Sequence, residues 1–296
     1  MLYKNFKLGI VLLNYGDPKF CINLIKSLIK IREKFYIVII DNFSTEHNSK
    51  KLKEFIKKYK HKFIYLKKSK NLGYGYGNNL GLKTCFKQLK CDYSLVLNPD
   101  IILKKNFSFS SLIKIKKNDM CIFTGIVNEN NKNHSLHKFN KLTLRFSDYN
   151  KKQSNGKLPV IPSGSCIGFT KKFWEDFGGF SKNYFLYFEE LDLIYRYFKK
   201  YNTFPLVKVL QSIKLTHLQG GTMSIANKKQ SITVDYWSCR ARIIFLRIHL
   251  FWYLPIGLLY NVFKIFHRLV CFQITNIKSL ILGTFSGITF KYKKNE

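Results

Sequence analysis

Apolar runs alternate with amphipathic segments over the first hundred residues, and this alternation limits the possible folds more than any other feature. Four runs are suited to strands buried on both faces; they are residues 8–14 (LGIVLLN), 36–41 (YIVIID), 63–66 (FIYL) and 93–100 (YSLVLNPD). Between them, we predict a helix that starts near Pro18 and a basic helix over residues 49–60. Strands that alternate with helices predict a doubly wound, mostly parallel α/β sheet flanked by helices.

Polar side chains follow these predicted strands at their carboxyl ends. They are Asn14, Asp41, Asn42, Asn98 and Asp100. Ligands of doubly wound sheets bind beyond the carboxyl ends of the strands, so we expect the functional site there. For Asp41 alone, a turn at the strand end explains the residue at least as well as ligand binding does.

A glycine-rich stretch, NLGYGYGNNLG, occupies residues 71–81. It is not a dinucleotide fingerprint, because the frame that starts at Gly73 requires glycine where Asn78 stands. No Gly-Lys-Ser/Thr follows it, which excludes a P-loop. The glycines allow the backbone to approach a ligand closely before a helix begins near Asn78. A flexible loop with aromatic anchors is the alternative.

Two residues are candidate metal ligands. Asp100 ends the sequence LNPD (97–100), and a carboxylate at this point can hold a divalent cation against a diphosphate. His217 begins HLQGGTMS (217–224), although a single histidine is more often structural. Each residue is a weak signal by itself.

Three carboxylates fall within four positions of the stretch FLYFEELDLIYR, residues 185–196. They are Glu189, Glu190 and Asp192, in a chain with 17 acidic residues against 51 Lys and Arg. Acidic residues favour the first turn of a helix, so a solvated helix start is the simplest explanation. We expect Asp192 to orient a site or to pair with Arg196 at i, i+4.

The formal net charge of +34 favours attraction to polyanions. The basic residues are mostly Lys and are scattered, and Lys, Ile, Asn, Phe and Tyr are abundant together. We interpret this as a global compositional bias and expect no nucleic acid partner. Seven Cys without a C-x-x-C pair argue against a disulfide framework and a structural zinc site, and favour reduced thiols in the cytoplasm.

The second half of the chain is divided by composition. Residues 128–158 are polar and predict an irregular, mobile loop, whereas 171–180 predict a short helix closed by a Gly pair. We place a domain boundary between residues 1–226 and a helical region at 227–296. Within that region, residues 243–266 are apolar, but Pro255 and several polar residues argue against a membrane span. An element in the membrane interface and a buried helical pair remain alternatives.

The motifs follow one order along the chain. They are Asn14-Tyr15, Asp41-Asn42-Phe43-Ser44, Asn71-x-Gly73-Tyr74-Gly75-x-x-Asn78-Asn79, Leu97-Asn98-Pro99-Asp100, Gly178-Gly179-Phe180, Phe185-x-Tyr187-x-Glu189-Glu190-x-Asp192-Leu193-x-x-Arg196 and His217-x-x-Gly220. Over roughly residues 8–250 this set resembles the family 2 inverting glycosyltransferases of GT-A fold, most of all the rhamnosyltransferase type of bacterial cell-surface polysaccharide synthesis. Asn98-Pro99-Asp100 stands where the family has D-x-D, and Glu189-Glu190 replaces its usual Glu-Asp.

The resemblance implies transfer of a sugar from a nucleotide-sugar donor to a hydroxyl of a lipid-linked or oligosaccharide acceptor. Rhamnose from dTDP-rhamnose is the first expectation, and a UDP-hexose or UDP-N-acetylhexosamine is the alternative. Asp100 would hold Mg²⁺ or Mn²⁺ on the diphosphate, with His217 as a second ligand or a phosphate contact. Asp41 would hold the nucleoside, and the donor pocket would also include Asn14, Asn42, Asn71, Gly73, Asn78 and Asn98.

The resemblance also implies a carboxylate base, for which Glu190 is the first candidate and Glu189 its rival. Two adjacent carboxylates raise the pKa of at least one of them. Phe185, Tyr187 and Phe188 would form an acceptor platform or pack in the core. A basic surface would hold the enzyme at the cytoplasmic face of an anionic membrane. A nucleotidyltransferase and a non-catalytic basic binding module are the rival interpretations.

Overall fold

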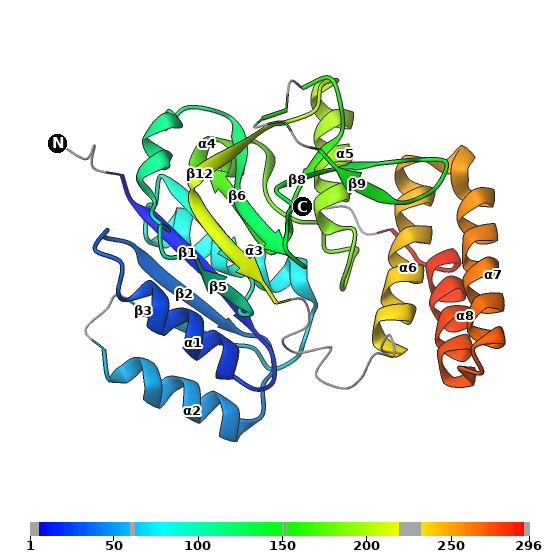
Figure 1. Ribbon diagram of the computed structural model, residues 1–296, viewed down its shortest axis with the longest axis horizontal. Coiled ribbons are helices and arrows are strands. Elements are labelled where there is room, and N and C mark those ends of the chain that lie inside the picture. Colours follow the sequence, from blue (N-terminus) through cyan, green and yellow to red (C-terminus); the bar gives the residue numbers. More distant parts are fainter. Residues whose placement is uncertain are drawn as a thin grey trace.

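The computed structural model describes residues 6–59, 63–149, 151, 153–154, 156–218 and 232–292. Its centre is a nine-stranded sheet with the order β3-β2-β1-β4-β11-β6-β12-β5, and β7 pairs with β6 (Figure 1). These strands are β1 (Leu8–Asn14), β2 (Tyr36–Asp41), β3 (Phe63–Lys67), β4 (Tyr93–Leu97), β5 (Ile101–Leu103), β6 (Cys121–Glu129), β7 (Lys132–Asn133), β11 (Cys166–Thr170) and β12 (Leu206–His217).

The first four strands are parallel, as the sequence predicts. The register pairs Asn14 with Asp41, so the carboxyl ends of β1 and β2 are level. The second half of the sheet is mixed, because β11 runs antiparallel to both β4 and β6. The prediction of a mostly parallel, doubly wound sheet is therefore confirmed most fully in the first hundred residues.

Helices cover both faces of this sheet. They are α1 (Lys19–Leu28), α2 (Glu46–Lys57), α3 (Tyr74–Lys83), α4 (Lys171–Phe177) and α5 (Glu189–Tyr201), with short turns at Thr84–Gln88 and Ser110–Lys114. Alternate residues of β1 point to opposite sides: Ile10 packs in a core with α1 and α2, and Val11 in a core with α3, α4 and α5. Helix α2 begins earlier than residue 49 because Thr45 caps it, its side chain accepting from the Asn48 backbone N–H at 3.3 Å.

The prediction of an irregular, mobile loop over residues 128–158 is wrong. Strand β6 continues to Glu129, and a separate three-stranded sheet has the order β10-β8-β9. Its strands are β8 (Leu136–Phe139), β9 (Phe146–Asp148) and β10 (Val160–Pro162). Leu136, Phe139, Leu144 and Tyr149 are buried in the main core and hold the hairpin in place within this polar stretch.

The C-terminal region is helical, as predicted, and lies at one end of the molecule (Figure 1). It contains α6 (Ile232–His249), a single turn at Phe251–Tyr253, α7 (Leu254–Val270) and α8 (Ile274–Ile288). Helix α6 packs on the rest of the protein through Phe245, which contacts the rings of Phe139 and Phe188. None of the helices in the described residues is both long enough and apolar enough to cross a membrane. The predicted domain boundary falls outside the described residues.

Helix α3 lies directly on β1 because glycines face the strand. A Cβ atom on Gly81 would lie 2.3 Å from Cγ1 of Val11, and one on Gly77 would lie 2.3 Å from Cδ1 of Leu13. This close approach also fixes the start of α3, and therefore Tyr74, at the carboxyl edge of the sheet.

Gly81→Ala is predicted to destabilise the protein although alanine is the better helix former. The stiff Val11 side chain cannot move far, so overpacking that costs about 1–3 kcal/mol outweighs a helix gain of about 0.5–1 kcal/mol. Lys83→Ala on the exposed side of α3 is the control and should stay within about 0.5 kcal/mol of wild type. Urea denaturation measures both changes, and a Gly81→Ala variant as stable as wild type would contradict the close packing.

Candidate active site

A cavity of about 470 Å³ opens at the carboxyl ends of β1, β2 and β4. It is lined by Leu13, Tyr15, Asn42, Asn71, Gly73, Tyr74, Asn98, Pro99, Asp100, Phe185, Leu186, Tyr187, His217, Thr233 and Trp237. This group includes the second predicted metal ligand, His217, and five of the predicted donor-site residues: Asn42, Asn71, Gly73, Asn98 and Asp100. A larger hollow of about 970 Å³ near Arg32 and Lys104 contains none of the predicted site residues.

Asp100 and His217, far apart in the sequence, meet in this cavity. Strand β12 pairs with β5 so that His217 lies opposite Ile101, next to Asp100. The Nε2 atom of His217 lies 3.3 Å from Oδ1 of Asp100. The other ring nitrogen, Nδ1, lies 2.7 Å from Oε1 of Glu129, at the end of β6. The motifs did not indicate Glu129, whose role depends on the pairing of β6 with β12.

This donor set fits a divalent cation. The carboxylate of Asp100 and Nε2 of His217 lie side by side at the cavity, and Glu129 holds the remaining ring nitrogen, as carboxylates behind metal-binding histidines commonly do. Mg²⁺ and Mn²⁺ accept such a sparse protein ligand set when phosphate and water complete it. Burial lowers the pKa of His217, but the hydrogen bonds to Asp100 and Glu129 outweigh burial and raise this pKa to about 9. A cation at Nε2 therefore displaces a proton.

The acidic cluster begins α5 after an unusual turn. Tyr187 and Phe188 have φ angles of 72° and 69°, a left-handed conformation that is costly for residues other than glycine. Glu189 follows with 2% exposure, and among the described residues its Oε1 has no hydrogen-bond partner. A Cβ atom on Gly164 would lie 2.1 Å from Oε1 of Glu190, so the glycine leaves room for that carboxylate.

Glu190 lies beside the wall of the cavity, and its environment differs from that of Glu189. Tyr74 lines the cavity and donates a hydrogen bond of 2.6 Å to the carbonyl of Gly164, against which Glu190 packs. Burial raises the pKa of Glu189 well above its usual range, and the charge of Glu190 raises it further. Burial raises the pKa of Glu190 to about 7. Of the two carboxyl groups, Glu189 is therefore the harder to ionise, and Glu190 is the better candidate for a group that gains and loses a proton near pH 7.

Asp192 points away from the cavity and holds α5 in place. Its Oδ2 accepts from Nε of Arg196 at 2.6 Å, which confirms the predicted i, i+4 pair. Its Oδ1 lies 2.8 Å from Nε2 of His249 on α6, and the other end of Arg196 donates to the Gly179 carbonyl. Burial raises the pKa of Asp192, but the His249 hydrogen bond and the Arg196 charge outweigh it and lower this pKa. These contacts favour an orienting role over direct chemistry.

Asp41 and Asn14 do not line the cavity. The Asp41 carboxylate is fully buried and accepts from the Ser44 backbone N–H at 3.0 Å, from Ser49 Oγ at 2.6 Å and from the Tyr65 hydroxyl. Asn14 donates to Ser44 Oγ at 3.3 Å. Both side chains therefore shape the turn after β2, which is the structural alternative that the sequence left open.

Asn42, Asn71, Gly73 and Asn98 do line the cavity. Asn42 Nδ2 donates to Asn71 Oδ1 at 2.7 Å, and the same oxygen accepts from the Gly73 backbone N–H at 2.9 Å. Gly73 has φ 95°, and a Cβ atom there would lie 2.3 Å from the Phe185 carbonyl oxygen. The sequence predicted that the backbone at this glycine approaches a ligand closely; in the structure it approaches the backbone of Phe185. Asn78 is fully buried on α3 and is not among the lining residues.

The aromatic residues before the acidic cluster divide between cavity and core. Phe185 and Tyr187 line the cavity, and Phe185 stacks on Trp237 with ring centroids 4.1 Å apart and an interplanar angle of 20°. Phe188 is buried beside Phe245. Trp237 and Thr233 belong to α6, so the C-terminal helical region contributes directly to the cavity. All the predicted site residues precede residue 227, so these two side chains were not expected.

The sequence is similar to a known protein family and to one characterised relative. Residues 10–177 match the sequence model of the family described as Glycosyl transferase family 2. The chain is 27% identical over 203 residues to the low-salt glycan biosynthesis hexosyltransferase Agl10 of Haloferax volcanii. The match covers 64% of this chain and 61% of the relative, so the chain spans less than two thirds of that protein's length.

Solved structures share the fold at low sequence identity. The mannosyltransferase PcManGT from Pyrobaculum calidifontis, in complex with GDP-Man and Mn²⁺, has a TM-score of 0.57 at 8% identity, with 97% of this chain and 88% of that chain covered. GalNAc-T7 with UDP, GalNAc and Mn²⁺ has a TM-score of 0.56 at 13% identity, with coverages of 81% and 50%. S. aureus TarS 1–349 with UDP-GlcNAc has a TM-score of 0.53 at 17% identity, with coverages of 81% and 66%. The predicted GT-A-type α/β fold is confirmed.

Asp192→Ala is predicted to lower the free energy of unfolding by about 3–5 kcal/mol, because it leaves the largely shielded Arg196 without its counter-charge and the buried His249 side chain without its hydrogen-bond partner. The matched control is Asp176→Ala, which breaks the exposed i, i+4 pair with Lys172 and should cost about 0–1 kcal/mol. Since the pKa of Asp192 is lowered in the folded protein, its contribution is complete above about pH 4 and is lost as pH falls through the folded pKa. Equal costs in urea denaturation at pH 7 would exclude this role.

Proposed function

The chain belongs to glycosyl transferase family 2, and from this we propose that it is an inverting glycosyltransferase that uses a nucleotide-sugar donor. One observation carries the proposal: the half-buried carboxylate of Glu190, whose pKa burial raises to about 7, packs against Gly164 next to a cavity in which Asp100 and His217 converge. A base and a diphosphate-binding group are the two parts that this reaction requires.

Glu190 is the proposed base. It accepts the proton of an acceptor hydroxyl while that oxygen attacks the anomeric carbon, and a single displacement of this kind inverts the configuration. Burial and the charge of Glu190 raise the pKa of Glu189, which disfavours a second negative charge beside the base. Asp100 and His217 would hold Mg²⁺ or Mn²⁺, which neutralises the departing nucleoside diphosphate.

The lining residues indicate how a donor is held. Asn42, Asn71 and Asn98 offer amide groups, and Asn42 Oδ1 has no hydrogen-bond partner among the described residues. The stacked pair of Phe185 and Trp237 offers a flat apolar surface. These groups suit a nucleoside or a sugar ring, both of which combine hydroxyl groups with apolar faces. A buried acidic base is not explained by a non-catalytic basic binding module.

We propose rhamnose, from dTDP-rhamnose, as the sugar because the order of motifs is closest to the rhamnosyltransferase type. A UDP-hexose or UDP-N-acetylhexosamine is the second candidate. It is favoured by the Haloferax relative, which is a hexosyltransferase, and by the UDP-GlcNAc bound to TarS. The acceptor is proposed to be a lipid-linked or oligosaccharide hydroxyl of a surface polysaccharide.

The outer surface of α7 and α8 supports a lipid-linked acceptor. Exposed apolar side chains recur at helical spacing there; they are Leu259, Val262, Phe263, Phe266, Leu269, Val270, Ile274, Ile281, Leu282, Phe285 and Ile288. Trp252 and Phe272, at the ends of α7, are 89% and 90% exposed. Surfaces of this kind on soluble domains mark contacts with membranes or proteins.

Charge favours an anionic membrane as the partner of this apolar surface. Between residues 232 and 292 the sequence has seven Lys and Arg and one acidic residue, Asp235. Arg242, Arg268 and Asp235 are buried, whereas Lys278 and Lys291 are exposed. Each basic residue near an anionic leaflet contributes about 1 kcal/mol of attraction. We therefore propose a cytoplasmic protein that binds peripherally at the inner face of the cytoplasmic membrane, with α7 and α8 in the interface. The alternative of a fully buried helical pair does not fit these exposures.

Glu190→Gln is predicted to lower the transfer rate by about 10²–10⁴-fold without weakening donor binding, because the amide cannot accept the proton. The assay is a panel of dTDP-, UDP- and GDP-sugars with Mg²⁺ or Mn²⁺, scored for donor turnover and by calorimetry for binding. For wild type, kcat/KM should fall as pH drops below about 7, where Glu190 becomes protonated. Glu54→Gln, on the exposed side of α2, is the control.

Three results would separate the assignments. Full activity of Glu190→Gln would refute the base, while turnover of the UDP-sugars alone would refute rhamnose. Absence of turnover for every donor, with intact folding and no nucleotide binding, would refute the glycosyltransferase function itself.

Replacing Phe263 and Phe266 together by Gln is predicted to abolish co-sedimentation with vesicles that contain anionic lipid, because the change removes apolar contact area without altering charge. Ile113→Gln is the control, since Ile113 is 56% exposed on the catalytic domain. Wild-type binding should weaken in high salt. Equal sedimentation of the double variant and wild type would exclude α7 as the contact surface.

A further inference from the structure

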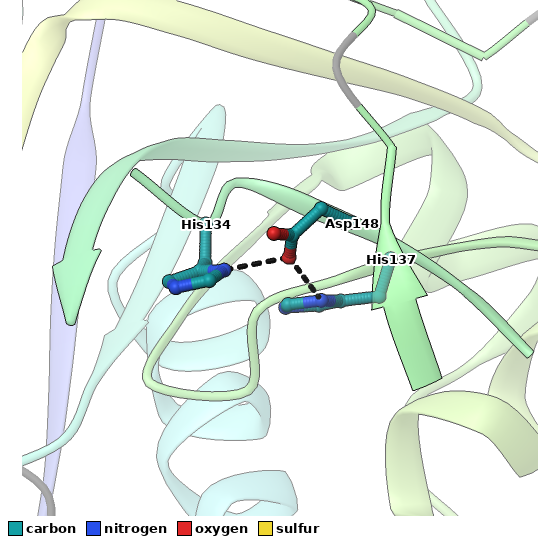
Figure 2. Close-up of side chains that lie close together, drawn as sticks. All are labelled: His134, His137 and Asp148. Carbon is teal, nitrogen blue, oxygen red and sulfur yellow. Dashed lines mark hydrogen bonds and ion pairs between the residues drawn. The ribbon is translucent and has the colours of Figure 1, made fainter. Parts of the chain in front are cut away.

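Two histidines and an aspartate converge on the small sheet, outside the cavity described above. His137 is on β8 and lies directly opposite Asp148 on β9, and His134 precedes β8 (Figure 2). One ligand atom from each of the three side chains lies within 4.8 Å of the other two. Among the described residues this is the group of His, Cys, Asp and Glu with such mutual spacing.

The distances are close to those of a metal coordination sphere. Nδ1 of His134 and Nδ1 of His137 lie 2.6 Å and 3.6 Å from Oδ1 of Asp148. Ligand atoms 2.0–2.2 Å from a tetrahedral ion are about 3.3 Å apart, which falls between these two values. The imidazole rings are nearly parallel, with an interplanar angle of 19°. The Nδ1 atoms of both rings face the same carboxylate (Figure 2). Coordination of one tetrahedral ion would lengthen the His134–Asp148 contact and slightly shorten the His137–Asp148 contact.

The backbone around the three ligands is held by pairing on several sides. His134 donates its backbone N–H to the Val127 carbonyl of β6, and His137 lies opposite both Asp148 and Ile161 in the small sheet. The side chains of His134 and His137 are largely shielded, at 18% and 23% exposure, whereas Asp148 is 42% exposed. Ligands on paired strands keep their geometry better than ligands on loops, and the exposed carboxylate leaves a path for an ion to enter.

We propose that His134, His137 and Asp148 form a second divalent-metal site that takes Zn²⁺ or a similar borderline ion. Imidazole nitrogens suit Zn²⁺, Co²⁺ and Ni²⁺, whereas Mg²⁺ prefers oxygen ligands, so the chemistry of this site differs from that of Asp100. Three protein ligands leave one tetrahedral position for water.

An ion at this site would stabilise the β8–β9 hairpin, which packs against the residue before the acidic cluster. It would join β9 to β8 and to the segment before β8. The same hairpin carries Phe139 and Phe146, whose rings lie 6.2 Å and 6.0 Å from the ring of Phe188. Phe188 is the left-handed residue immediately before Glu189. The site is thus connected by direct packing to the turn that positions the acidic pair.

The test uses Co²⁺ as a visible probe and the full chain carrying His217→Ala, which removes the imidazole of the cavity. In this background we expect one Co²⁺ per chain with the absorption bands of a four-coordinate nitrogen–oxygen site. His134→Ala and His137→Ala should each weaken binding by at least about 100-fold, since even the loss of a group that only hydrogen-bonds to a ligand costs about 10–100-fold. His267→Ala, a histidine on α7, should leave the bands unchanged.

A second measurement keeps the result interpretable if a variant folds poorly. Zn²⁺ should raise the melting temperature of the His217→Ala protein, and this rise should disappear in Asp148→Asn, whose amide preserves a hydrogen bond. Circular dichroism in chelator checks that each variant is folded. Two results would overturn the proposal and leave a metal-free imidazole–carboxylate pair. One is the absence of Co²⁺ bands at millimolar Co²⁺, and the other is Co²⁺ binding by the His134→Ala and His137→Ala proteins with the same affinity as the parent His217→Ala protein.

Discussion

The burial of carboxylates at the start of α5 is the constraint on which the site depends. A buried carboxylate is unfavourable unless it is paired, hydrogen-bonded or protonated. The three members of the cluster differ: Asp192 pairs with Arg196 and hydrogen-bonds to His249, burial and the charge of Glu190 raise the pKa of Glu189, and burial raises the pKa of Glu190 to about 7. The stable ion pair anchors the turn, and the unpaired neighbour beside the cavity remains available for chemistry.

The central sheet performs the corresponding task for the proposed cation ligands. Asp100 directly precedes β5, and Glu129 and His217 end β6 and β12, so the pairing of β12 with β5 and with β6 brings the three side chains together. The imidazole has a carboxylate on each side, so its ring cannot rotate without losing both contacts. This fixed ring gives the cavity a positively charged group that can meet a diphosphate or give way to a cation.

Patterns within single segments of the sequence predicted the features that depend on interactions within one strand or one helix. The parallel strands β1, β2 and β4 and the Asp192–Arg196 pair follow from spacing along one element. Strand β3 is only half-buried, and the Thr45 cap of α2 was not predicted. Asp41 was ambiguous because a strand-end carboxylate can bind its own turn or a ligand with the same sequence, and here it binds its turn. Glu129 and Trp237 could not be predicted, since their roles arise from strand register and from the docking of α6. The small sheet was missed because its buried hydrophobic residues, Leu136, Phe139, Leu144 and Tyr149, are spaced too irregularly for a periodic signal.

The position of α6 has a geometric consequence for the acceptor. One side of this helix supplies Thr233 and Trp237 to the cavity, and α7 and α8 pack on it from outside (Figure 1). In the proposed membrane-bound state, the helical layer would act as a spacer whose thickness is about that of one or two helices, each about 10–12 Å across. The fold would then set the height of the proposed active site above the lipid. Acceptors whose reactive hydroxyl projects by a comparable length from the membrane would be selected by reach, before any side chain recognises their sugars.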